Sequence, residues 1–213
     1  MKTMLISLSL IYASFVYGQS DSAYYGAMVK GMEQLKNCKE KADYLQTANY
    51  FQFVWQAAQG EWLPSYYAGF CYIMAAFNEE KGDQTDQYLD LAQGCIDKSI
   101  VLDPTESEIL TLQGMLHQAR IKVSPMSRGK KYSELANKSL EEAKALNPQN
   151  PRIYYLYGQN IFNTPKMFGG GAEAAKPYFE EASAKFSAFN PKSMFYPNWG
   201  AKTNSILLEK CSK

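Results

Sequence analysis

The stretch that decides the fold of this chain reads Ala136-x3-Leu140-x2-Ala143-x4-Pro148. The same spacing occurs as Ala92-x3-Ile96-x2-Ser99-x4-Pro104, and in a looser form as Ala175-x3-Phe179-x2-Ala182. Steps of three and four residues place these side chains on one face of a helix, and proline does not continue a helix. The pattern therefore predicts one helix that recurs with a period of 44 residues, the separation of Pro104 and Pro148.

Each recurring helix is preceded by another that carries a glycine in its middle. These glycines are Gly69, Gly114 and Gly158, and each costs about 0.5–1 kcal/mol relative to alanine. A cost repeated at the same point of three repeats indicates that two helices approach closely there. We expect the small partners to be Ala92, Ala136 and Ala175, because a larger residue at either place would overpack the contact by about 1–3 kcal/mol.

The helix signals together predict an all-α solenoid of about four helical hairpins plus a C-terminal capping helix. The predicted pairs are 22–36 with 40–58, 62–78 with 86–102, 106–122 with 132–146, and 151–163 with 172–189, and the last helix is 201–210. Loops are predicted at 79–85 and 123–131, each of which contains glycine. Because one hairpin cannot bury its own apolar face, the hairpins must stack to form a continuous core.

The hairpins resemble the tetratricopeptide repeat. Leu110, Gly114 and His117 stand at the positions of that family's first helix, as do Tyr154, Gly158 and Ile161. The Ala-bulky-Ala-Pro series quoted above matches its second helix. The resemblance is good over 104–182 and weaker before it, and the predicted loops are longer than the family's tight turn. It implies a protein that holds a peptide or a partner protein on its concave surface without catalysis.

Three further segments resemble a group of exported bacterial tetratricopeptide-like proteins. They are Glu61-Trp62-Leu63-Pro64-x-Tyr66-Tyr67, Pro165-x3-Gly169-Gly170 and Pro197-Asn198-Trp199-Gly200. This resemblance implies a place in the bacterial envelope and carries no implication about the ligand.

The start of the chain is predicted to be a signal peptide covering residues 1–18. Lys2 precedes an apolar stretch over 4–16 that is too short to span a bilayer. Cleavage is expected after Gly18 or Gln19, so that 19–213 forms a single domain that is periplasmic or extracellular. The alternative interpretation is a buried N-terminal helix. No other apolar stretch has the length of a membrane span.

The charge balance and the cysteine spacing limit the classes of partner and cofactor that we expect. With 22 Lys and Arg against 21 Asp and Glu, no clustered positive field for nucleic acid is expected. The four cysteines, Cys38, Cys71, Cys95 and Cys211, have no metal-motif spacing. We favour free, largely buried thiols over disulfides, because Cys71 is predicted to point away from the helix that carries Cys95. We expect no metal and no cofactor.

No catalytic constellation is visible. The one histidine, His117, is predicted to be packed, and no Ser-His-Asp order or metal-ligand cluster is present. The segment 168–171, Phe-Gly-Gly-Gly, precedes a helix whose free N–H groups can attract an anion. The simpler interpretation is a sharp turn with Phe168 folded inward. The chain is therefore predicted not to be an enzyme.

The candidate binding site is the concave face of the first helices of each pair. Residues three and four apart share a face, which gives a mixed aromatic and polar stripe: Tyr66, Phe70, Ile73, Glu108, Thr111, Met115, Gln118, Arg152, Tyr155, Gln159 and Phe162. Such a surface suits an extended peptide or a partner helix, and a homo-oligomer is possible. The alternatives are a pocket in which the aromatic groove closes on a small molecule or lipid, and a purely structural role for Phe70, Ile73 and Phe162.

Overall fold

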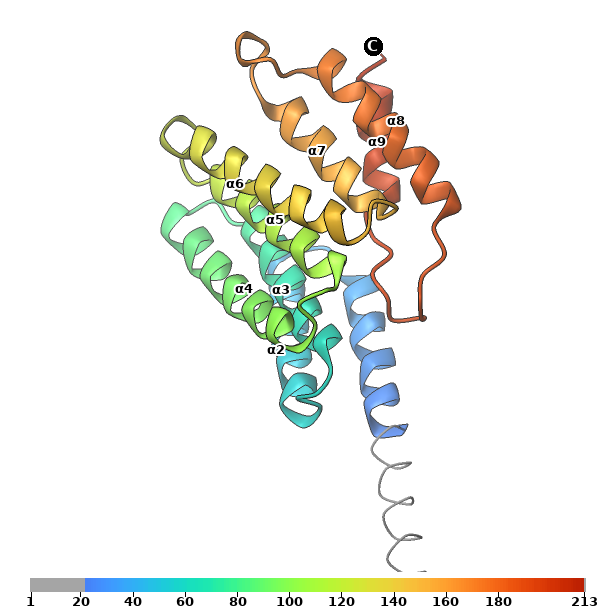
Figure 1. Cartoon of the computed structure of the whole chain (residues 1–213). Coiled ribbons are helices and arrows are strands. Elements are labelled where there is room, and N and C mark those ends of the chain that lie inside the picture. Colours follow the sequence, from blue (N-terminus) through green and yellow to red (C-terminus); the bar gives the residue numbers. More distant parts are fainter. Residues whose placement is uncertain (1–21, 213) are drawn as a thin grey trace, which may run out of the picture.

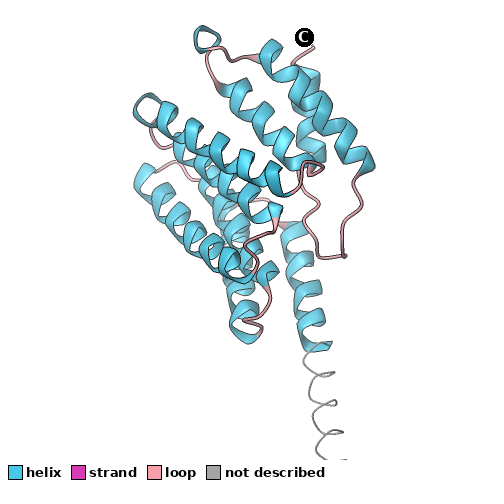
Figure 2. Ribbon diagram, viewed as in Figure 1, coloured by secondary structure: helices cyan, strands magenta, loops and turns pink. Residues whose placement is uncertain are grey.

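The structure is a computed structural model that describes residues 22–212; the predicted signal peptide lies outside them. The described residues form helices and no strand (Figures 1 and 2). A helix over residues 22–37 is followed by α2 (Lys41–Ala57), α3 (Trp62–Phe77), α4 (Gly82–Leu102), α5 (Ser107–Ile121), α6 (Pro125–Leu146), α7 (Pro151–Asn163), a short 3-10 turn η1 (Lys166–Phe168), α8 (Ala172–Ala188) and α9 (Ala201–Lys210).

The helices pack as successive antiparallel pairs. The most extensive contacts join α3 to α4, α5 to α6, α2 to α3 and α7 to α8, and α9 packs on α8 at the C-terminal end. Figure 1 shows the three turns that close these pairs along one edge of the array. The predicted all-α solenoid with a C-terminal capping helix is confirmed.

The predicted loops 79–85 and 123–131 are present but too long, because only 79–81 and 123–124 lie outside helices and the remainder of each segment is helical. α4 begins at Gly82 and α6 begins at Pro125. Proline is well suited to the first helical position, where no backbone donor is needed. Arg128 then fixes the new turns by a two-point contact with Asp86, with Nη1–Oδ1 2.7 Å and Nη2–Oδ2 2.8 Å. The chain therefore has longer helices where loops were expected, and its turns are short.

The predicted close approach at the mid-helix glycines is present, but a bulky residue shares each contact. A Cβ on Gly69 would lie 3.4 Å from the carbonyl oxygen of Ala92 and from the Cβ of Cys95. At Gly158 the neighbour is the ring of Phe179, 2.6 Å from the position of an added Cβ. Gly69 therefore makes room for the backbone of the facing helix, and Gly158 makes room for an aromatic ring.

All four cysteines are free thiols in the structure. Cys71 and Cys95 are buried, whereas Cys38 and Cys211 are half-buried. Burial raises the pKa of the Cys95 thiol to about 11, which keeps it protonated and unreactive at neutral pH. Among the helices described, none combines the length and the apolar character that crossing a membrane requires.

Candidate functional site

The first part of the predicted stripe is covered by the chain itself. Residues 189–200, here called the C-terminal strap, leave α8, run along the molecule and return to α9 (Figure 1). The indole Nε1 of Trp199 donates to the hydroxyl of Tyr66 at 2.8 Å. The Trp199 ring lies 5.4 Å from that of Phe70 and 6.3 Å from that of Tyr155. Trp199 thus occupies the place where the stripe was expected to hold a partner.

Further contacts attach the strap to α3 and to the start of α5. Tyr67 donates its hydroxyl to the carbonyl oxygen of Phe195 at 2.8 Å. Glu106 accepts from the Tyr196 hydroxyl at 2.7 Å and pairs with Lys192 Nζ at 2.8 Å. Burial raises the pKa of Tyr196 far above its ordinary value, so this phenol stays a donor. The strap is therefore fastened by polar groups as well as by its aromatic rings.

A charged pair lies beneath the strap. Arg152 donates from Nε to Glu108 Oε2 at 2.7 Å and from Nη2 to Oε1 at 2.5 Å, and both side chains are almost fully buried, with exposures of 0% and 1%. The guanidinium lies over the ring of Phe189 at 4.5 Å. Burial raises the pKa of Glu108, and the charge of Arg152 opposes that rise. The ion pair is therefore part of the buried core and is not exposed to a ligand.

The predicted stripe residues therefore fall into two groups. Those that the strap, the core or neighbouring helices bury are Tyr66, Phe70, Ile73, Glu108, Thr111, Met115, Arg152 and Tyr155. Gln118, Gln159 and Phe162 remain partly exposed, and all three lie toward the C-terminal ends of α5 and α7. Only this end of the predicted stripe is open to a ligand.

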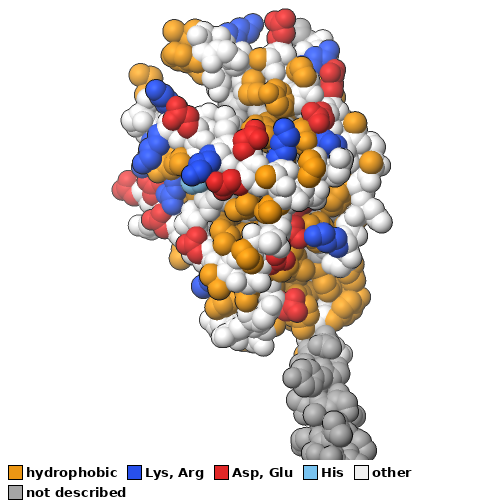
Figure 3. Space-filling view, in the orientation of Figure 1, with side chains coloured by type: hydrophobic (Ala, Val, Ile, Leu, Met, Phe, Trp, Pro, Cys, Tyr) orange, Lys and Arg blue, Asp and Glu red, His pale blue; other side chains and the backbone are white. Residues whose placement is uncertain are grey.

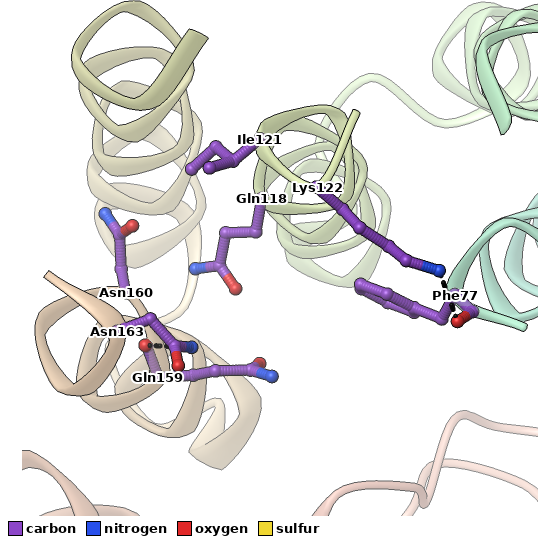
Figure 4. Close-up of a pocket in the computed structure, with 7 residues that line it drawn as sticks. All are labelled: Phe77, Gln118, Ile121, Lys122, Gln159, Asn160 and Asn163. Carbon is purple, nitrogen blue, oxygen red and sulfur yellow. Dashed lines mark hydrogen bonds between the residues drawn. The ribbon is translucent and has the colours of Figure 1, made fainter. Parts of the chain in front are cut away.

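A pocket of about 240 Å³ lies at this open end. Its lining consists of Phe77 from α3, Gln118 and Ile121 from α5, Lys122 directly after α5, and Gln159, Asn160 and Asn163 from α7. Figure 4 shows Gln118 and Gln159 reaching into the space between the two helices, with the Phe77 ring beside the stem of Lys122. The stripe prediction included Gln118 and Gln159 and missed the others. The same spacing of three and four, continued for one more turn, reaches Ile121, Lys122 and Asn163.

Most polar groups of the pocket already have partners. Lys122 Nζ donates to the carbonyl oxygens of Ala76, Phe77 and Glu79, at 3.3, 2.7 and 2.5 Å, and so caps α3. The Gln118 amide donates to the Leu156 carbonyl oxygen at 2.8 Å. Among the residues that line the pocket, only Gln159 has a side-chain amide with no hydrogen bond to another described residue. The pocket consequently offers mainly apolar walls and a single amide that is free to orient a ligand.

The turn between α7 and α8 differs from its prediction. Phe168 was expected to fold inward, but it is 72% exposed, and its neighbour Met167 is 82% exposed. The turn closes on its own backbone, since Gly170 N donates to Pro165 O at 3.3 Å and Gly171 N to Ile161 O at 2.9 Å. A Cβ on Gly170 would lie 2.1 Å from the Thr164 carbonyl oxygen, so this position of the turn accepts only glycine. These bonds also use N–H groups that an anion would need.

His117 contacts residues that do not line the pocket. Its ring stacks on that of Tyr132, with centroids 6.1 Å apart, and Nε2 lies 3.1 Å from the amide of Gln113. Burial lowers the pKa of His117 to about 4, which leaves a neutral, packed side chain at pH 7. Among the described residues, no group of three or more His, Cys, Asp or Glu side chains has the arrangement of a metal site.

Comparison with solved structures relates this chain to a known binding protein. No family model matches this chain, and neither does any curated protein. Among solved structures, the HusA haemophore from Porphyromonas gingivalis is similar, with a TM-score of 0.79 and 30% sequence identity. The similarity covers 88% of this chain and 92% of that one. That neighbour is a binding protein; the finer resemblance to tetratricopeptide repeats stays a prediction.

Proposed function

Because this chain belongs to the same family as the HusA haemophore, we propose that it is a non-catalytic protein that binds haem. The observation that carries the proposal is similarity over nearly the full length of both chains. Of the two functions considered for the concave face, binding of a small apolar molecule is therefore preferred to the holding of a peptide.

The pocket between α5 and α7 is the proposed place of binding. Haem is a flat, largely apolar macrocycle with two carboxylates at one edge, and small-molecule sites combine apolar walls with a few polar groups. Phe77 and Ile121 supply such walls, and Gln159 supplies a free amide. Trp199 covers the concave face at Tyr66, Phe70 and Tyr155, so the opposite end is the part that a ligand can enter.

The peptide-binding alternative has less support. A peptide along the whole stripe would have to displace the strap from Tyr66, Glu106 and Arg152, together with the bonds that each of these residues makes to it.

Export is proposed with the haem function, on the basis of Lys2 and the apolar stretch 4–16. N-terminal sequencing of the protein from the periplasm or the medium tests it; a mature start at residue 19 or 20 is expected.

Haemin titration tests the function directly. The wild-type protein is expected to shift the Soret absorbance of haemin in a saturable way with one site per chain. Ile121→Asp, which places a charge against an apolar macrocycle, is expected to weaken binding at least tenfold, about 1.4 kcal/mol or more. Ile206→Asp on α9 is the matched control, since Ile206 is an exposed isoleucine outside the pocket, and it should bind like the wild type.

Two outcomes would count against the proposal. If the wild-type protein leaves the haemin spectrum unchanged while in-cell crosslinking recovers a specific protein partner, the peptide-holding function takes its place. If haemin binds but Ile121→Asp and Ile206→Asp behave alike, the protein binds haem at another place than this pocket.

A further inference from the structure

Three large apolar side chains on two neighbouring turns are largely exposed to solvent. Met126, in the first turn of α6, is 100% exposed, and Met167 and Phe168 follow α7 with the exposures given above. Figure 3 shows a notch between the α5–α6 turn and the α7–α8 turn, with hydrophobic atoms on both sides of it. Single exposed apolar side chains are common on proteins, but a group of them around one notch is typical of a binding site.

Local bonds order the backbone of both turns. Pro125 starts α6, and Ser127 Oγ and Ser124 Oγ hydrogen-bond at 2.7 Å across its first turn. On the other side, the backbone bonds of 164–171 close a tight turn with Gly169 at φ 82°. The apolar side chains are therefore displayed by ordered backbone, which lowers the entropy that a ligand contact would cost.

The two turns continue the walls of the pocket. Ile121 and Lys122 line the pocket at the end of α5, and the chain reaches Met126 four residues after Lys122. Asn163 lines it from the end of α7, and Met167 follows four residues later. A ligand larger than the 240 Å³ pocket would extend outward between these turns.

The same turns carry positive charge and no acid. Residues 121–133 contain Lys122, Arg128, Lys130 and Lys131, and residues 164–172 contain Lys166; neither segment has an Asp or Glu. Lys122 and Arg128 are engaged as described, whereas Lys130 and Lys166 are exposed and have no ion-pair partner in the part of the chain that the structure describes. Free cations beside apolar side chains match a ligand that is apolar and carries carboxylates.

We propose that the two turns form the outer half of the haem site, which we call the mouth: Met126, Met167 and Phe168 cover the macrocycle, and Lys130 and Lys166 pair with its carboxylates. This inference rests on the proposed function. Methionine suits such a surface because its unbranched, polarisable side chain adapts to the ligand, and the Phe168 ring can lie against a flat π-system.

A double variant tests the apolar part of the mouth. Met167→Ala with Phe168→Ala is expected to weaken haemin binding at least tenfold with an unchanged melting temperature, because both side chains are exposed and unpacked. The matched control is Phe53→Ala with Val101→Ala, which removes two apolar side chains that are 68% and 82% exposed on α2 and α4. The control should bind haemin like the wild type. Equal affinity of the two double variants overturns the inference.

A second pair of variants tests the charges. Lys130→Gln with Lys166→Gln is expected to weaken haemin binding about fivefold to tenfold but to leave binding of haemin dimethyl ester unchanged, because the ester has no carboxylate charge. Lys202→Gln with Lys210→Gln, on the exposed face of α9, is the control. An equal loss for haemin and its ester contradicts the carboxylate pairing. A wild-type protein that binds neither compound refutes the proposed function itself, which separates that failure from a failure of the mouth.

Discussion

Trp199 and Tyr66 are joined by a 2.8 Å hydrogen bond between residues 133 positions apart. The bond closes the concave face at its N-terminal end, because the Trp199 ring also lies against Phe70 and Tyr155. One side chain of the strap therefore decides which part of the solenoid a ligand can reach.

Removal of the Trp199 ring is expected to destabilise the protein. Trp199→Ala should lower the free energy of unfolding by about 3 kcal/mol, because it leaves an unfilled space among buried aromatic rings. Trp199→Phe keeps most of the packing and loses one hydrogen bond, so about 1 kcal/mol is expected. Urea unfolding measures both. Equal losses for the two variants would show that the hydrogen bond, and not the ring, holds the strap.

The buried pair of Glu108 and Arg152 gives a second prediction. Arg152→Met leaves a buried carboxylate without its partner and should cost about 3–5 kcal/mol at pH 7. The loss should shrink at low pH, because burial already raises the pKa of Glu108 and a protonated Glu108 needs no cation. Adding Glu108→Leu to Arg152→Met should recover much of the stability. The prediction is wrong if unfolding of Arg152→Met shows the same deficit at pH 7 and pH 4.

The local part of this fold was predictable from the sequence, and the long-range part was not. The glycine and alanine series repeats at helical spacing, so it located α7 and α8 closely. The start of α6 was missed because Pro125 and Gly129 indicated a loop, whereas a partner 42 residues away, Asp86, fixes Arg128 in a helix. Periodicity also favoured a continuous open groove, since it cannot show that Trp199 returns to cover Tyr66. The exposure of Phe168 was missed because the backbone bonds that close its turn, such as Gly171 N to Ile161 O, do not show in the sequence.

Glu79 is expected to contribute to the acid sensitivity of the protein. Its carboxylate pairs with Lys41 Nζ at 2.8 Å and accepts from the backbone N of Glu80 and Lys81 at 2.9 and 3.0 Å. The side-chain contact with Lys41, and then the backbone bonds, lower the pKa of Glu79 to about 2. A carboxyl whose folded pKa is lowered stabilises the protein above its unfolded pKa, about 4.3, and loses that contribution as the pH falls toward 2.

The measurement is the melting temperature of Glu79→Gln relative to wild type between pH 7 and pH 2. The variant should melt lower at pH 7, and the difference should fall below pH 4 and vanish near pH 2. Glu80→Gln is the neighbouring control, and its melting temperature should follow the wild type throughout. A difference for Glu79→Gln that stays constant over the whole range would contradict the assigned role of the carboxylate charge.

Gly158 tests whether the mid-helix glycines are packing devices. An alanine Cβ there would lie 2.6 Å from the Phe179 ring, so Gly158→Ala should destabilise by about 1–3 kcal/mol even though alanine is the better helix former. Gly129→Ala, also inside a helix but with nothing within 4 Å of an added Cβ, should instead stabilise by about 0.5–1 kcal/mol. Phe179→Leu should reduce the penalty of Gly158→Ala in a double-mutant cycle, because the smaller side chain vacates the space that the new methyl group needs. If Gly158→Ala and Gly129→Ala change the unfolding free energy in the same direction, close packing is not the reason for the glycine.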